Sequence, residues 1–423
     1  MDRTARPAAV TSPGFMERDI LNEDVEKGKS ERVLTVGTLE DDTAPLVTAS
    51  PCDERPRDAG GAGGGDGGVH VHSSMATRVL PRLLVICLLA VLLLGSVLGN
   101  MRHGRPTAEG KNQKPVVALS QDPITEEEGL NLRPIIGILS QELSRSMDNA
   151  LQPHNYSSYI AASYVKFYES AGARVVPVLI NQEDEYYHNI ASSVNGVVFP
   201  GGSASITNSS GYGRAGDLLY QLLQKRDPPV PLLTTCLGFE MMMYLGANNT
   251  YPLTRCKASS RADPLYLLPD WESSRLLGSA PSDVLETFIM TNSTSNFHKY
   301  CVLPETFEEL GLDQEYFVLS TSIDDEGVEY ISTVEHKTLP YYGVQWHPEK
   351  NPFEWKFSSI PHSRRAIRAA QYIANFFVEE ARHNNQTFAT EEEEKEALIY
   401  NYCPMYTADL YSSSSFQQCY FFP

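Results

Sequence analysis

The chain has 423 residues and a formal net charge of −19, with 34 Lys and Arg against 53 Asp and Glu. This length allows roughly two or three domains of about 150 residues. The acidic balance argues against nucleic-acid binding, because contacts with phosphates need clustered Lys and Arg. No Cys-x-x-Cys pair occurs among the seven cysteines, so no metal site is predicted.

The N-terminal third divides into three segments by composition. Residues 1–74 contain the run GGAGGGDGG and scattered charge, which predicts a disordered extension or an artefact of the gene model. Residues 75–99 carry two arginines ahead of an uncharged apolar run at 83–98, the pattern of a secretory signal peptide. Cleavage near Gly99 is favoured, and the alternative is an uncleaved signal anchor that holds the chain to the membrane. Residues 100–131 are polar and indicate a linker or propeptide.

Glycosylation signals follow the apolar run. The Asn-x-Ser/Thr acceptors are Asn155, Asn208, Asn248, Asn292 and Asn385. Each triplet is weak alone, but together with the signal they predict a glycosylated, lumenal or secreted protein. Cysteines pair in such a compartment, and the four candidates Cys256, Cys301, Cys403 and Cys419 allow three pairings.

Regular structure is predicted to begin with the apolar run 135–139, typical of a strand buried on both faces. A helix is expected over 157–171, where apolar residues recur at helical spacing until Gly172. The next elements are a strand over 173–180, a short helix and strand over 189–202, a helix over 214–227 and a strand over 230–235.

This alternation predicts an α/β fold, a three-layer sandwich in which helices flank a mostly parallel central sheet. The later half is less regular. Two β runs joined by a turn near Lys337 are expected within 326–346, followed by a long amphipathic helix over 363–385. The last segment, 389–423, is rich in Tyr and Phe and is predicted to pack on the core.

Cys236 stands where the fourth strand passes directly into a helix, in the run TTCLGFE. Functional sites of parallel sheets lie at the carboxyl ends of strands. The free amides at a helix N-terminus favour a thiolate, so a lowered pKa is expected for this thiol. Gly238 allows the helix to begin close to the sheet. A buried core cysteine is the alternative interpretation.

A cysteine nucleophile needs a base and an oxyanion hole. The run GVQWHPEK places His347 at a strand end, with Glu349 as the group that orients its ring. The run FPGGS offers the amide of Gly202, which together with that of Leu237 forms a candidate oxyanion hole. A structural histidine and a plain Gly-Gly turn are the alternatives.

These runs resemble class I glutamine amidotransferase-like (flavodoxin-like) hydrolases. With RPIIGIL, NFHKY and SSFQQCY, they resemble the γ-glutamyl hydrolases more narrowly, from about residue 133 to the C-terminus. The resemblance makes 132–423 the catalytic domain of an omega peptidase. It implies cleavage of folylpoly-γ-glutamates in lysosomes or after secretion, a homodimer and no cofactor.

The resemblance also implies substrate-binding roles for Tyr159, Glu240, His298, Gln345 and Lys350. From the residues alone, Lys350 is the best-placed cation for an anionic polyglutamate tail, or a solvated loop charge. Glu240 either caps helix amides or binds the substrate, and His298 either binds substrate or is loop polarity. One departure concerns the elbow, where Thr234 replaces the first glycine of the wider family's Gly-x-Cys-x-Gly.

Three other functions remain open at this point. A glutaminase module would feed ammonia to a synthetase, but the signal segment and the lack of a synthetase domain argue against it. A hydrolase for another γ-glutamyl conjugate differs only in its substrate. A non-catalytic binding protein would usually have lost Cys236 or His347.

Overall fold

The computed structural model describes residues 129–410 and 414–423. The predicted extension, the signal segment and most of the predicted linker lie outside these residues. The last residues of that linker are bonded to the folded chain, since Asn131 N–H donates to the carbonyl of Arg382 over 2.8 Å. Within the described ranges, no helix has the length and apolar character needed to cross a membrane.

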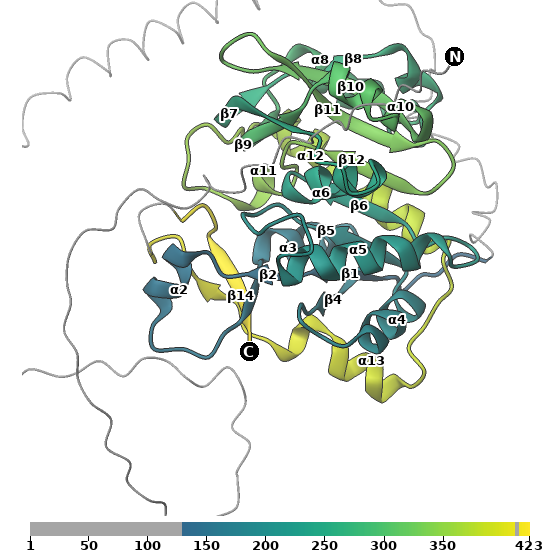
Figure 1. Cartoon of the computed structure of the whole chain (residues 1–423), viewed down its shortest axis with the longest axis vertical. Helices are drawn as coiled ribbons and strands as arrows, with labels where there is room; N and C mark the ends of the chain where they lie inside the picture. The colour runs from purple at the N-terminus through teal and green to yellow at the C-terminus, as the bar shows by residue number, and fades with distance from the viewer. Residues whose placement is uncertain (1–128, 411–413) are drawn as a thin grey trace, which may run out of the picture. The chain divides into compact units, whose positions relative to one another are not determined.

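The central sheet has eight strands in the order β4-β1-β5-β6-β12-β11-β10-β8 (Figure 1). Its parallel half consists of β4 (Arg174–Val178), β1 (Ile135–Leu139), β5 (Gly196–Phe199), β6 (Leu232–Thr235) and β12 (Tyr341–Val344). The antiparallel half adds β11 (Glu329–His336), β10 (Tyr316–Ile323) and β8 (Tyr266–Leu267). The parallel half has the 2-1-3-4-5 strand order of flavodoxin-like sheets, as expected.

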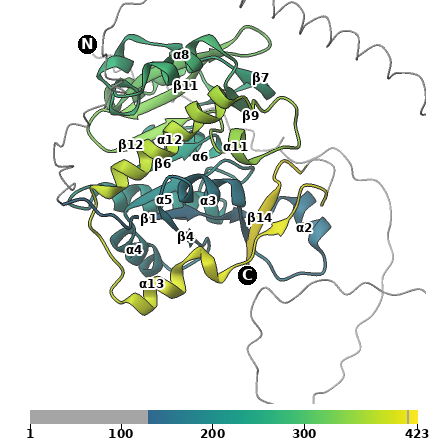
Figure 2. The same cartoon turned by 180° about the vertical axis from the view of Figure 1, so that it is seen from behind.

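Helices cover both faces of the sheet. The face toward the viewer in Figure 1 carries α4 (Asp184–Ser193), α5 (Gly211–Gln224) and α6 (Leu237–Gly246). The opposite face carries α3 (Ala162–Glu169), α11 (Lys350–Phe353) and α12 (Arg364–Arg382), seen in Figure 2. Alternate residues of β1 enter the two cores, Leu139 one and Ile138 the other, because side chains of a strand alternate between faces. The predicted three-layer sandwich is therefore confirmed.

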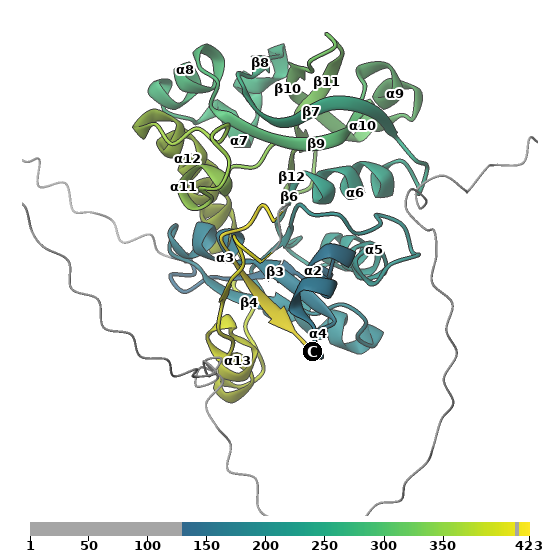
Figure 3. The same cartoon turned by 90° about the vertical axis from the view of Figure 1, so that its left-hand side faces the viewer.

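The described chain also contains two smaller sheets (Figure 3). In one, β7 (Leu253–Asp263) pairs with β9 (Thr294–Val302). The other has the order β13 (Met405–Tyr406), β14 (Gln418–Phe422), β3 (Ser158–Ala161) and β2 (Gln141–Glu142). The remaining elements are α2 (Arg145–Leu151), η1 (Pro269–Ser273), α7 (Arg275–Gly278), α8 (Ser282–Met290), α9 (Pro304–Glu309), α10 (Leu312–Glu315), α13 (Glu391–Ala397) and η2 (Ile399–Asn401).

The helix predicted over 157–171 is wrong in its first part. Residues 158–161 form β3 and pair with β14, with Cys419 opposite Ala161, so α3 begins only at Ala162. Pairing with a strand 260 residues away overrides the local helical pattern. The same pairing confirms that the C-terminal segment packs on the core, since Cys419 and Phe422 are both 0% exposed.

Candidate active site

Cys236 occupies a sharp turn between β6 and α6. Its backbone has φ 51° and ψ −107°, a conformation that is strained for a residue with a side chain and that presents the side chain at a strand-to-helix corner. Gly238 permits this corner, because a Cβ there would lie 2.0 Å from the carbonyl oxygen of Phe199. The helix therefore starts against the sheet, as the sequence predicted.

Thr234 is accommodated by a glycine on the neighbouring strand. It pairs with Gly343 of β12, and its hydroxyl donates to the carbonyl of Tyr342 over 3.1 Å. A Cβ at Gly343 would lie 3.1 Å from that hydroxyl oxygen and 2.6 Å from Cε of Met242. The room for the elbow thus comes from a glycine opposite the position where the wider family has one.

The predicted nucleophile and base meet beside Gly201. A Cβ at Gly201 would lie 2.6 Å from Cε1 of His347, 2.9 Å from the hydroxyl oxygen of Tyr164 and 3.1 Å from Cβ of Cys236. A cavity of about 290 Å³ opens at this point. Its lining includes five of the predicted site residues, namely Cys236, His347, Gly202, Tyr159 and Lys350.

His347 is held by a buried carboxylate. Its Nδ1 lies 2.7 Å from Oε1 of Glu349, which is 0% exposed. The Tyr164 hydroxyl lies 3.3 Å from the same ring nitrogen, and the backbone N–H of His347 donates to the carbonyl of Ser295 over 2.8 Å. With Nδ1 directed at Glu349, Nε2 is the nitrogen left to accept a proton.

The protonation states differ from the sequence-based expectation for the thiol. Burial raises the pKa of Cys236 well above its usual value, and the charges of Glu240 and Glu349 raise it further. The Lys350 charge and the Leu237 N–H oppose this shift but do not reverse it. The expected lowering of the thiol pKa by the helix N-terminus is therefore wrong for the free chain.

His347 and Glu349 form a neutral–ionised pair. Burial lowers the pKa of the His347 imidazole, although the Glu349 carboxylate favours its charged form. Burial also opposes ionisation of Glu349, but the positive charge that His347 carries when it is protonated, together with their hydrogen bond, outweighs burial and lowers the pKa of that carboxyl. A neutral imidazole beside a neutral thiol is ready to act as a general base.

The predicted oxyanion donors lie on either side of the elbow. The N–H of Gly201 donates to the Tyr164 hydroxyl over 2.7 Å, so this amide is occupied. Gln141 clamps the same loop, donating to the Gly201 carbonyl over 2.9 Å and accepting from the Ser203 N–H over 3.1 Å. This arrangement leaves Gly202 on the cavity wall, while the Leu237 N–H points at the sulfur.

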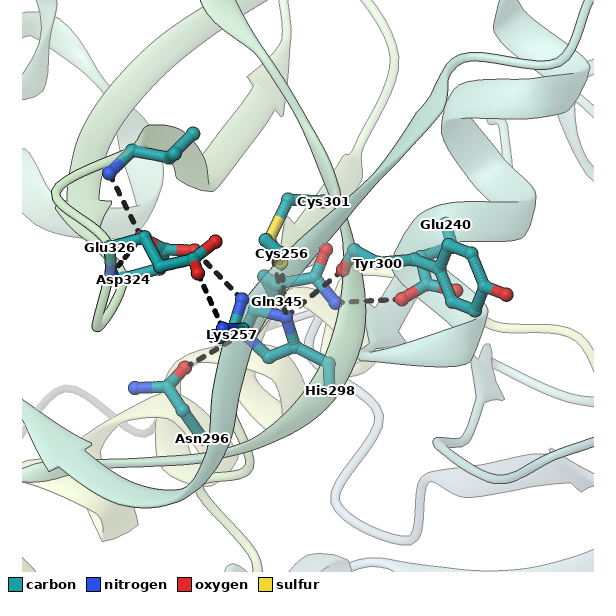
Figure 4. The surroundings of a disulfide bond; sticks show 11 residues. Glu240, Cys256, Lys257, Asn296, His298, Tyr300, Cys301, Asp324, Glu326 and Gln345 are labelled. Atoms are coloured by element: carbon teal, nitrogen blue, oxygen red, sulfur yellow. Dashed lines mark hydrogen bonds and ion pairs between the residues drawn. A yellow bond between two sulfur atoms is a disulfide. The ribbon is translucent and has the colours of Figure 1, made fainter.

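Three predicted substrate residues do not line this cavity. Gln345 donates through Nε2 to Oε1 of Glu240 over 3.1 Å, and burial raises the pKa of Glu240 to about 8. Figure 4 shows this pair near His298, which lies beside the disulfide between Cys256 and Cys301. The Nδ1 of His298 is 3.0 Å from the Tyr300 carbonyl oxygen, and burial lowers the pKa of this imidazole to about 3.

The disulfide settles one of the open pairings. Cys256 joins Cys301, whereas Cys419 is a free, buried thiol whose sulfur accepts from the Thr407 hydroxyl over 3.5 Å. Cys256, His298 and Cys301 also form the only group of potential metal ligands within the described ranges. Because the two sulfurs are bonded to each other, this group is not arranged for a metal ion.

Three residues that shape the cavity are not predicted from the sequence. The sequence places Tyr164 in the apolar stripe of a helix, yet its hydroxyl contacts both Gly201 and His347. Phe297 and Phe416 line the cavity from β9 and from the C-terminal segment, and only three-dimensional contacts bring them there. A larger cavity of about 710 Å³, between α4 and residues 387–402, contains none of the predicted site residues.

Comparison with known proteins identifies relatives of this chain. The family model described as Peptidase C26 matches residues 134–349. The γ-glutamyl hydrolase of Rattus norvegicus is 41% identical over 294 residues, which cover 69% of this chain and 90% of the relative. The γ-glutamyl hydrolase of Homo sapiens is 40% identical with the same coverage. The γ-glutamyl hydrolase B of Dictyostelium discoideum is 36% identical over 298 residues, 69% of this chain and 84% of the relative.

Proposed function

Because this chain belongs to the peptidase C26 family of γ-glutamyl hydrolases, we propose that it cleaves γ-glutamyl bonds of folylpoly-γ-glutamates through a thioester on Cys236. One observation supports this mechanism above others. A cysteine on a strained strand-to-helix corner shares a cavity with a histidine whose other ring nitrogen is bonded to a buried carboxylate. This arrangement contains the three groups of a nucleophile–base–orienter triad.

The reaction begins from neutral groups. As the Cys236 sulfur attacks the γ-carbonyl carbon, its proton passes to Nε2 of His347, which becomes an imidazolium stabilised by Glu349. The carbonyl oxygen becomes an oxyanion and accepts hydrogen bonds from the amides of Gly202 and Leu237. Proton transfer during the attack removes the need for a preformed thiolate, which burial disfavours.

The intermediate then collapses by breaking the carbon–nitrogen bond. His347 returns its proton to the leaving amine, which departs as glutamate or an oligo-γ-glutamate and leaves a thioester on Cys236. Next, His347 accepts a proton from water, and the hydroxide attacks the thioester carbonyl. The Cys236 sulfur then leaves the carbonyl carbon as a thiolate and takes the proton from His347. This step frees the acyl product.

Substrate recognition is assigned to the cavity walls. A γ-linked glutamate chain carries one free carboxylate per residue, so the substrate is strongly anionic. Lys350 is the cation of this cavity and Tyr159 forms part of its wall, and both support binding of such a chain. Glu240, Gln345 and His298 do not line this cavity, so their proposed contribution is to support the site or to bind a more distant part of the substrate.

Substitution of each of the two free cysteines tests the proposed function directly. We expect Cys236→Ala to abolish cleavage of a synthetic pteroyl-polyglutamate, measured by chromatography of the products. Cys419→Ala is the control, because Cys419 is also a buried free thiol but does not line the cavity. Retained turnover in Cys236→Ala would overturn the mechanism. Ammonia release from free glutamine, with no cleavage of the polyglutamate, would instead indicate a glutaminase.

The domain organisation and the cellular location of the protein are proposed together. We propose residues 1–74 as an extension, 75–99 as a signal peptide, the residues up to 131 as a linker and 132–423 as the catalytic domain. A glycosylated homodimer in lysosomes or the extracellular space fits this organisation. All five acceptor asparagines are exposed, which leaves them accessible for modification. N-terminal sequencing, glycosidase treatment and light scattering of secreted protein test these points.

A further inference from the structure

Lys350 is a buried cation whose ammonium forms no ion pair or hydrogen bond with any group in the described part of the chain. The residue is 2% exposed, and the buried carboxylates of Glu349 and Glu354 feel its charge without being in ion-pair contact with it. Instead, Nζ lies 5.0 Å from the ring centroid of Phe297 and 4.6 Å from that of Phe416. Aromatic faces attract a cation and partly offset its loss of water. Because all three residues line the Cys236 cavity, the ammonium is available to an anion that enters it.

The rings of Phe297 and Phe416 connect the ammonium to His347 on one side and to Tyr159 on the other. The ring of Phe297 meets that of His347 edge-on, with centroids 6.1 Å apart. The ring of Phe416 packs on that of Tyr159, also with centroids 6.1 Å apart. A continuous wall therefore runs from the base through the ammonium to Tyr159. An anion bound at Lys350 lies close to the bond that Cys236 attacks.

Glu354 fixes Phe416 relative to Lys350. Its N–H donates to the Lys350 carbonyl over 2.9 Å, so both residues belong to the same helical turn. Its Oε2 accepts from the backbone N–H of Gln417 over 2.6 Å. On the other side, the carbonyl of Phe416 accepts from the buried hydroxyl of Thr407 over 2.9 Å. The backbone that carries the ring is thus held from two directions.

We infer that Phe297 and Phe416 hold the Lys350 ammonium as a receptor for a substrate α-carboxylate beside the scissile bond, with Glu354 as the positioning residue for Phe416. This inference rests on the proposed γ-glutamyl hydrolysis. In a γ-linked chain each α-carboxylate is free, whereas in an ordinary peptide it is consumed by the next bond. A charge-assisted contact in a desolvated cavity therefore selects γ-linked substrates.

The test compares three substrates. The parent is p-aminobenzoyl-γ-glutamyl-γ-glutamate, and each analogue has one of the two α-carboxylates flanking the scissile bond replaced by an amide. We expect the wild-type full chain to lose kcat/KM on one analogue, which identifies the carboxylate that Lys350 binds. Loss of one cation–π contact corresponds to about tenfold in binding, so Phe416→Leu should reduce this preference by about tenfold, mainly through KM.

Matched variants separate the receptor from general packing. Phe421→Leu is the control, because Phe421 is 7% exposed against 8% for Phe416 and lies in the same C-terminal segment. Its ring packs on those of Tyr156 and Tyr159, whereas the Lys350 ammonium lies over the ring of Phe416. It should keep the full preference, as should Phe416→Tyr, which retains the ring face. Lys350→Met should abolish the preference, and Glu354→Ala should lower it as Phe416→Leu does.

The preference is a ratio of two rates in one sample, so it does not depend on the folded fraction. If Phe416→Leu does not fold, Lys350→Met and Phe416→Tyr decide by the same ratio. Full preference in Lys350→Met or Phe416→Leu would overturn the receptor while the proposed function stands. Wild-type protein that cleaves none of the three substrates would overturn the proposed function itself.

Discussion

The protonation of Cys236 reflects two opposing effects of very different size. A helix N-terminus stabilises a negative group by typically 0.3–1 kcal/mol, which is less than one pKa unit. Full burial shifts the pKa of a side chain by up to about 3–5 units toward its neutral form. Because Cys236 is only 5% exposed, the second effect dominates. The position at the helix N-terminus therefore supplies backbone amides and orients the side chain, but it does not keep the thiol ionised.

The charge of Glu349 should be visible in the pH dependence of catalysis. In Glu349→Gln the amide oxygen can still accept from His347, so the ring stays oriented, but the charge that raises the His347 pKa is lost. We expect kcat to fall less than in Cys236→Ala. The acid limb of kcat/KM, which follows protonation of His347 and lies below the usual histidine pKa, should move to lower pH by about one unit or more.

A pH–rate profile of both proteins measures this shift. Glu335→Gln is the control, because Glu335 is 4% exposed and accepts from the N–H of Leu276 over 2.9 Å, away from the cavity. It should leave the acid limb in place even if the protein is less stable. An acid limb that moves to higher pH in Glu349→Gln would contradict the assigned charges.

At the scale of elements, the junction of β6, β12 and α6 explains how a threonine fits the elbow. The strained backbone is at Cys236, whereas Thr234 is an ordinary strand residue with its side chain over Gly343. The glycine requirement has therefore moved to the neighbouring strand. Replacing Thr234 by glycine would not relieve the turn, because the strain is two residues further along the chain.

Thr234→Gly is thus expected to keep kcat within about twofold and to lower the free energy of unfolding by about 1–2 kcal/mol. The loss comes from a more flexible unfolded chain and the missing side-chain contacts. Steady-state kinetics and urea unfolding measure the two effects. Gly343→Thr is the matched variant and should be far more destabilising, since its Cβ would lie 2.7 Å from Cδ2 of Phe239. A large rise in kcat for Thr234→Gly would show that Thr234 limits the reaction.

Across the whole molecule, the sequence predicted best where the contacts are local. Strand β1 and helices α5 and α12 follow from apolar periodicity, and the corner at Cys236 follows from a strand and helix that are adjacent in the chain. The pairing of Cys236 with His347, 111 residues apart, was predicted from a histidine at the end of a β run, and the family resemblance supported it. The nearby Tyr164 was not predicted, because a helical pattern of apolar residues does not indicate what a tyrosine hydroxyl contacts.

Long-range pairing explains most of what was missed. The extended β7–β9 pair and the four-stranded sheet around β14 join segments whose own periodicity is weak. Strand β3 even has a helical pattern, and its partner β14 lies near the C-terminus. The burial that raises the Cys236 pKa also depends on the complete cavity, so no local rule could give its direction.

The C-terminal strand offers a test of this long-range assembly. Removing residues 418–423 deletes β14 and with it the pairing partner of Tyr159 and Ala161. Loss of a fully buried phenylalanine alone typically costs about 3–5 kcal/mol, and Phe422 is 0% exposed. We therefore expect a lower Tm and a marked loss of kcat/KM, because Tyr159 and Phe416 lose the strand that fixes them. Removing Pro423 alone, which is exposed, should change neither quantity by much. A truncated protein with wild-type Tm and kcat/KM would mean that β14 is dispensable and that the cavity wall is held by β3 and α11 alone.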